Sequence, residues 1–123
     1  MATDLDQVFT RIERLVKARG LPEVTRSTSE GTPTLQVRDK PFARLEDSTT
    51  LILHCPTEQK GLLMEISPDI YFDTDHYIGD PAVLIQLPVI SDEELSLRLE
   101  DAWRFRAPST LAAQRPTANP EHD

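Results

Sequence analysis

The sequence predicts an α+β fold, a two-layer sandwich in which three helices cover one face of an antiparallel sheet. Three observations lead to this prediction. Apolar residues recur at helical spacing from Asp4 to Arg19, they alternate with polar residues from Thr34 to Arg38, and a helix-start signal stands at Ser91. In chain order the elements are a helix, three to four strands, a helix, two strands and a helix, which we write as α-β3-α-β2-α. The 123 residues suffice for one domain with a single core, expected over 1–113, followed by a flexible tail over 114–123.

The first helix is predicted from Asp4 to Arg19. Thr3 stands where a cap is needed, and Gly20 followed by Pro22 ends the helix, because glycine accepts the left-handed conformation and proline cannot continue it. The apolar stripe of this helix comprises Leu5, Val8, Phe9, Ile12, Leu15 and Val16.

The strands follow, beginning with a polar edge strand over Val24–Glu30. A meander comes next, with turns at 39–41 and 46–49, and its three strands are Thr34–Arg38, Phe42–Leu45 and Leu51–Leu53. Later in the chain, a short strand is predicted over Ile70–Phe72 and a polar loop over 73–81. Apolar residues on both faces of Ala82–Leu87 predict a strand in a central position.

Two further helices are predicted. The middle helix runs from Thr57, its expected cap, to Ile66, with Leu62, Leu63 and Ile66 directed inward. The last helix starts with a capping box of Ser91 and Glu94 and runs to about Ala107, where Pro108 breaks it. One face of this last helix carries Leu95, Leu99, Ala102, Trp103 and Arg106.

The composition narrows the classes of function. The formal net charge is −8, which opposes sequence-independent binding to nucleic acid, although the stretch through Arg44 has eight basic against six acidic residues. One cysteine, Cys55, excludes an intramolecular disulfide, and no apolar run is long enough to span a membrane. The first residues are polar and lack the pattern of a signal peptide, so we expect a cytoplasmic protein.

Several strings resemble the MmcQ/YjbR family of small bacterial proteins. They are Lys40–Leu45, Pro68–Phe72, Thr74–Leu84 and Ala102–Pro108, and the resemblance extends over roughly Leu5 to Ala113. It implies a fold like that of the type III secretion chaperones. The family is often labelled DNA-binding, through a double-wing arrangement of β-hairpins, and it brings no agreed catalytic residues.

Two sets of residues are candidates for binding. If the hairpins act as wings, Arg26, Arg38, Lys40 and Arg44 are the residues that would meet phosphate; otherwise they are strand-edge charges that discourage aggregation. A possible ligand groove involves His76, Tyr77, Trp103 and Arg106, although a helical tryptophan on an apolar stripe more often belongs to the core.

Other constellations are weaker. Asp69, Asp73, Asp75, His76 and Asp80 match no calcium-loop spacing, so the sequence predicts no metal site and no cofactor. His54 and Cys55 are neighbours on a strand and point to opposite faces, so they predict no catalytic pair.

The sequence therefore predicts a monomeric, non-enzymatic binding domain. One interpretation is a DNA-binding domain with weak affinity, and the other is a protein- or peptide-binding module with a chaperone-like surface.

Overall fold

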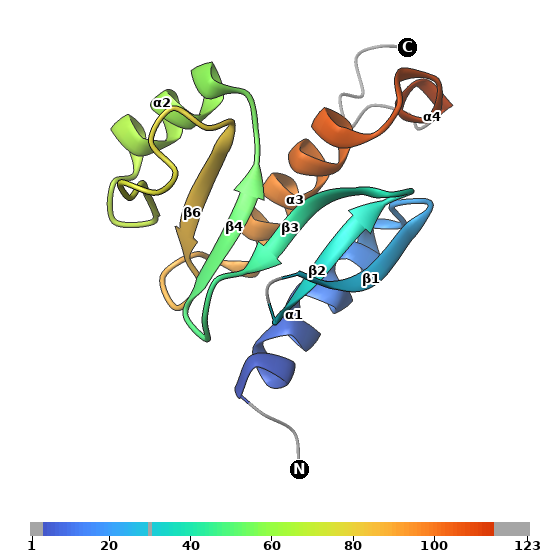
Figure 1. The fold of residues 1–123 in the computed structure, drawn as a ribbon, viewed down its shortest axis with the longest axis horizontal. Coiled ribbons are helices and arrows are strands. Elements are labelled where there is room, and N and C mark those ends of the chain that lie inside the picture. The colour runs from blue at the N-terminus through green and yellow to red at the C-terminus, as the bar shows by residue number, and fades with distance from the viewer. Residues whose placement is uncertain (1–3, 30, 115–123) are drawn as a thin grey trace.

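The structure is a computed structural model that describes residues 4–29 and 31–114. One six-stranded antiparallel sheet has the strand order β1-β2-β3-β4-β6-β5, and α1 and α3 pass behind it in the view of Figure 1. The helices are α1 (Asp4–Arg19), α2 (Thr57–Ile66), α3 (Asp92–Arg106) and α4 (Ser109–Gln114). The strands are β1 (Val24–Ser29), β2 (Thr32–Val37), β3 (Lys40–Leu45), β4 (Thr50–His54), β5 (Tyr71–Phe72) and β6 (Ala82–Gln86).

This architecture confirms the predicted α+β sandwich. Four strands precede α2, the upper of the three to four expected, because the predicted edge strand forms: Val24–Ser29 pairs along its whole length with β2. The boundaries of α1 and α2 are those predicted, and β6 lies between β4 and β5, away from both edges, as its two apolar faces indicated.

The core lies between the sheet and the helices. From α1, Phe9 and Ile12 are fully buried in it, and Gly20 ends this helix with a φ of +70°. The sheet contributes alternate residues of its central strands, such as Leu51 and Leu53 of β4. On the other face of the sheet, which we call the open face, a small second cluster of Ile52, Ala82 and Leu84 packs with Phe72 and Tyr77.

A bulge in β3 breaks the strict alternation of faces. Leu35 pairs with Ala43, but the next residue of β2, Gln36, pairs with Pro41, which leaves Phe42 as the extra residue. Phe42 and Ala43 are consecutive and both fully buried in the core. The preceding turn is centred on Arg38 and Asp39, one residue earlier than predicted, and Arg38 takes a φ of 56° there.

The predicted orientation of α2 is wrong. Leu62 is 57% exposed and Ile66 is 73% exposed, whereas the buried residue of this helix is Lys60. Among the three residues expected inward, only Leu63 packs against the core. The cap is also different, since Pro56 occupies the cap position and no side chain bonds to the helix start.

At α3 the sequence signals were largely right. The Ser91 hydroxyl accepts a hydrogen bond from the backbone N–H of Glu94 at 3.1 Å, but the Glu94 carboxylate binds the hydroxyl of Tyr71 instead of closing a capping box. Beyond α3, the chain forms one more helix, α4, which was not predicted, and Gln114 is its last residue. The rest of the predicted tail lies outside the described residues. No helix within the described ranges is long and apolar enough to cross a membrane.

Candidate functional site

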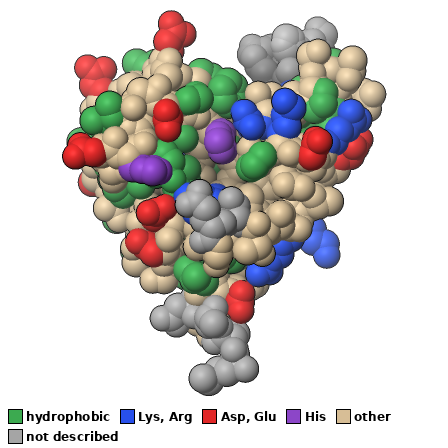
Figure 2. All heavy atoms as spheres, in the orientation of Figure 1, with side chains coloured by type: hydrophobic (Ala, Val, Ile, Leu, Met, Phe, Trp, Pro, Cys, Tyr) green, Lys and Arg blue, Asp and Glu red, His purple; other side chains and the backbone are tan. Residues whose placement is uncertain are grey.

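A groove of about 330 Å³ opens on the open face of the sheet, beside the small cluster of Ile52, Ala82 and Leu84. Its polar lining comes from four separate parts of the chain: Arg44 of β3, His54 of β4, the loop residues His76, Tyr77 and Asp80, and Arg106 of α3. Figure 2 shows this face of the molecule, where histidine side chains lie between Asp and Glu side chains on the left and Lys and Arg side chains on the upper right. We take this groove as the candidate site.

Arg44 reaches the groove because of its place in β3. Its neighbours Ala43 and Leu45 are buried against the helices, so alternation directs Arg44 to the open face, where it pairs in register with Ile52. The guanidinium donates to the Tyr77 hydroxyl at 2.7 Å and lies 3.5 Å from the carboxylate of Glu46. These contacts hold the arginine and the tyrosine together in one wall.

Arg106 approaches the groove from the last residue of α3. Its Nε donates to the backbone carbonyl of Pro41 at 2.9 Å, which ties the helix end to β3. His54 lies close to these cations. Burial, and then the positive charges of Arg106 and Arg44, lower the pKa of His54 from 6.5 to about 4, so its imidazole is neutral near pH 7.

The loop 73–81 is held in position by the buried Lys60 of α2. Its ammonium donates to the backbone carbonyls of Tyr77 at 2.9 Å and Asp80 at 3.1 Å, and it forms an ion pair with Asp73 at 2.9 Å. The rings of His76 and Tyr77 meet edge to face with centroids 4.8 Å apart. Lys60 therefore fixes the wall of the groove that carries these two rings.

The candidate groove residues are only partly brought together. His76, Tyr77 and Arg106 line the open-face groove, as the sequence interpretation requires. Trp103 does not, because it is fully buried on the helix side of the sheet and its indole N–H donates to the carbonyl of Pro22 at 3.0 Å. The tryptophan is a core residue, which was the alternative reading.

The four candidate nucleic-acid contacts do not share one surface. Arg26 pairs in register with the buried Leu35 and so lies on the helix side, whereas Arg44 lies on the open face. Arg38 donates to both carboxylate oxygens of Glu23, at 2.7 and 3.1 Å. Lys40 is exposed at the start of β3.

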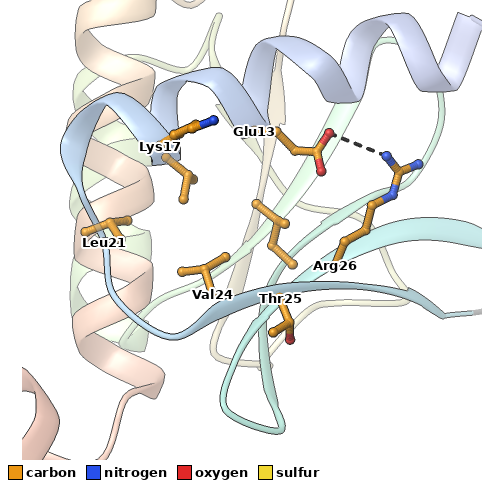
Figure 3. A pocket seen from close by; sticks show the side chains of 8 residues that line it. Glu13, Lys17, Leu21, Val24, Thr25 and Arg26 are labelled. Carbon is orange, nitrogen blue, oxygen red and sulfur yellow. Dashed lines mark hydrogen bonds and ion pairs between the residues drawn. The ribbon is translucent and has the colours of Figure 1, made fainter.

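Arg26 belongs to a second hollow, between α1 and β1. Figure 3 shows this cleft of about 290 Å³, where Arg26 and Glu13 form an ion pair at 3.4 Å. The guanidinium of Arg26 also lies 5.0 Å from the ring centroid of Phe9 and 3.3 Å from the carboxylate of Asp6. These contacts join the edge strand to the helix and leave Arg26 poorly placed to meet phosphate.

The structure also shows where the His54–Cys55 pair and the acidic residues considered as metal ligands lie. Cys55 is buried on the helix side while His54 lines the groove, so the two residues face apart as predicted. Burial raises the pKa of the Cys55 thiol to about 11, which keeps it protonated. Within 4–29 and 31–114, no group of three or more His, Cys, Asp or Glu side chains is arranged to hold a metal ion.

Sequence reasoning missed two residues of the site. His54 was examined only as a partner for Cys55, and Lys60 was not considered. A signal for Lys60 existed, because it shares a helical face with Leu63 and Met64, both of which pack against the core. For His54, the alternation in β4 already directed it to the same face as Ile52.

Comparison with known proteins gives the following likenesses. The family model described as YjbR matches residues 19–105, from the last residue of α1 to near the end of α3. Three curated mycobacterial proteins are each 38% identical to this chain over 52 residues, or 42% of its length. They are uncharacterized protein Rv2570 and uncharacterized protein MT2646 of Mycobacterium tuberculosis and uncharacterized protein Mb2600 of Mycobacterium bovis.

The matched stretch is 40% of each relative, so this chain spans about two fifths of the length of the curated proteins it resembles. No solved structure matches the chain. The likeness to secretion chaperones therefore stays a prediction.

Proposed function

This chain belongs to the YjbR family, and on that premise we propose that it is a non-enzymatic domain that binds a protein partner in the open-face groove. We further propose that it acts as a monomer in the cytoplasm. The observation that carries the proposal is the groove itself, where Arg44, His54, Tyr77 and Arg106 converge from distant parts of the sequence.

The size of the groove favours a single inserted group. At about 330 Å³ it lies at the small end of the roughly 300–1,000 Å³ range of ligand pockets, enough for one side chain or one chain end. An extended peptide can supply such a group while the rest of it runs over the open face. A duplex, by contrast, needs several cations on one surface.

The charge distribution opposes nucleic acid as the partner. Arg26 and Arg38 are already bonded to carboxylates, and Arg26 and Arg44 lie on opposite sides of the sheet. The net charge of −8 adds repulsion at long range. We expect duplex DNA to bind at or beyond the weak end of the roughly 10⁻⁴–10⁻⁶ M range of non-specific binders at physiological salt.

Among the residues that the structure describes, Cys55 and His54 do not form a catalytic pair, which supports the proposal of a non-enzymatic function. A nucleophile needs an adjacent base, and the buried Cys55 thiol faces away from His54, which lies in the groove. The groove is rich in hydrogen-bond donors, which suits recognition of a charged or polar group.

A library of immobilised peptides, probed with the labelled full chain at physiological salt, tests the proposal. We expect some of the peptides to bind the labelled wild-type chain. The same peptides should not bind an Arg106→Gln variant. The matched control is Arg38→Gln, which removes an arginine that does not line the groove and is bonded to Glu23, and it should leave binding unchanged. A labelled duplex DNA is titrated in parallel.

Two results would contradict the proposal. One is the absence of any peptide that distinguishes Arg106→Gln from Arg38→Gln. The other is submicromolar binding of the duplex that is lost in an Arg38→Ala/Lys40→Ala double variant, because this would make the hairpins a DNA-binding surface.

A further inference from the structure

The guanidinium of Arg106 presents an unused pair of donors to the groove. Its Nε is bonded to the carbonyl of Pro41 at 2.9 Å, so the planar group is held in one orientation. Within 4–29 and 31–114, its two terminal nitrogens have no hydrogen-bond acceptor and no carboxylate partner. A fixed arginine with both terminal nitrogens available matches the two oxygens of a carboxylate or phosphate.

Two further donors face the same space. The Tyr77 hydroxyl accepts a hydrogen bond from Arg44 at 2.7 Å, and its own proton has no acceptor in the described part of the chain. His54 is neutral near pH 7 and lines the groove, so one of its ring nitrogens carries a proton that it can donate. Donors from three elements therefore surround one small volume.

The electrostatic environment of the groove is also suited to an anion. After burial, which contributes most, the charges of Arg106 and Arg44 lower the pKa of His54, so both guanidinium groups act on the space around its ring. Acidic groups of the described part of the chain also lie there, among them Glu46, 3.5 Å from Arg44, and Asp80, which lines the groove. Glu46 offsets part of the charge of Arg44, so Arg106 is the principal cation available to a ligand.

We propose that the open-face groove is an oxyanion site for a carboxylate or phosphate group. The two terminal nitrogens of Arg106 donate to two oxygens of this group, and the Tyr77 hydroxyl donates a third hydrogen bond. Arg44 supplies charge and orients the tyrosine. The inference rests on the proposed function, since the oxyanion is then the group that a partner inserts, but it is tested without any partner.

The test uses nuclear magnetic resonance of the full chain, titrated separately with sodium acetate and with inorganic phosphate at constant ionic strength. Acetamide, which has the shape of acetate without its charge, is the ligand control. We expect saturable shifts of the His54 ring and the Arg106 Nε–H signals with at least one of the two anions and none with acetamide. The tighter of the two anions identifies the oxyanion for which the site is built.

Proton linkage gives a second readout. A bound anion favours the charged imidazolium, so the pKa of His54 should rise above about 4 when the site is occupied. The other titratable or charged groups that line the groove are Arg44, Arg106, His76, Tyr77 and Asp80. A rise of the His54 pKa on addition of the anion, absent with acetamide, supports the site.

Variants decide the role of Arg106. We expect Arg106→Gln to weaken anion binding at least tenfold and Arg38→Gln to leave it unchanged, while Arg106→Lys recovers only part of the affinity because it lacks the planar fork. The proposal would be overturned if the His54 signals did not shift, or shifted without reaching saturation, with both anions. Equal anion affinity of the wild type and Arg106→Gln would also overturn it.

The two proposals can fail separately. If acetate or phosphate binds but no peptide does, the oxyanion site stands and the peptide-binding function fails. If peptides bind through the groove while neither anion shifts His54, the function stands and the oxyanion site is refuted.

Discussion

Replacing Lys60 with methionine tests how the groove is held in shape. The side chain of Lys60 is 7% exposed and that of its partner Asp73 is 15% exposed, so the pair is largely buried. Methionine keeps the length and apolar contacts of the lysine stem but removes the ammonium. The change leaves the carboxylate of Asp73 and the carbonyls of Tyr77 and Asp80 without their donor.

The expected cost follows from these contacts. Removing one partner of a buried ion pair costs about 3–5 kcal/mol, and we expect about 3 kcal/mol because Asp73 keeps some contact with water. With an unfolding entropy of roughly 2 cal/mol/K per residue, each kcal/mol shifts the melting temperature of a domain of this size by about 4 °C. The predicted decrease for Lys60→Met is therefore about 12 °C.

Urea and thermal unfolding, followed by circular dichroism, measure this change. Lys17→Met is the matched control, because Lys17 is an exposed lysine of α1, and it should alter stability by less than about 0.5 kcal/mol. Adding Asp73→Asn to Lys60→Met should recover at least about 1 kcal/mol, since the uncompensated carboxylate is then gone. A cost below about 1 kcal/mol for Lys60→Met would refute the reasoning that this ammonium secures the loop.

Three other predictions concern buried groups. Trp103→Ala should cost about 3–5 kcal/mol in urea unfolding, because the ring is fully buried and its N–H is bonded to Pro22; a loss below about 1 kcal/mol would contradict this. Since the pKa of His54 is about 4 when folded and near 6.5 when unfolded, unfolding takes up a proton between these values. Stability should therefore fall as the pH is lowered from about 6.5 to about 4, by at most about 3 kcal/mol, and His54→Gln should remove this part of the pH profile. Cys55, with a pKa of about 11, should resist alkylation at pH 8 unless the chain is unfolded, and rapid labelling of the native protein would contradict its burial.

Local signals explain why most of the fold was predictable. Gly20 and Ser91 act within one helical turn, so the end of α1 and the start of α3 could be read from a few neighbouring residues. The central position of β6 followed from apolar residues on both of its faces. Each of these features depends on short-range sequence patterns.

The orientation of α2 could not be obtained in this way. Leu62 and Ile66 share a helical face and are the obvious choice for the core, yet that face is exposed. Lys60 is buried instead because its acceptors, the carbonyls of Tyr77 and Asp80, lie 17 and 20 residues further along the chain. Because these acceptors lie outside the helix, its sequence could not decide between the face of Lys60, Leu63 and Met64 and the face of Leu62 and Ile66.

The candidate site was predictable only in part for the same reason. Trp103 and Arg106 are three residues apart on α3, but one side chain enters the core and the other extends past the helix end to Pro41. Arg44 and His54 meet the loop residues through the pairing of β3 with β4 and of β4 with β6. Helical spacing wrongly placed Trp103 and Arg106 in one site. Arg44 and His54 could not be placed together from the sequence, because it does not reveal the register between strands.

The bulge at Phe42 gives the two sides of β3 separate roles. Because one residue is extra, Phe42 fills the core while its neighbour Pro41 faces the groove and receives the hydrogen bond of Arg106. In a regular strand, a residue change that shifts the backbone moves both faces together. In β3 the extra residue separates the groove side from the core side. A substitution at Pro41 is therefore expected to change the groove with little effect on the packing of Phe42 against the helices. The side of β3 that lines the groove is therefore less constrained by packing than the side that faces the helices.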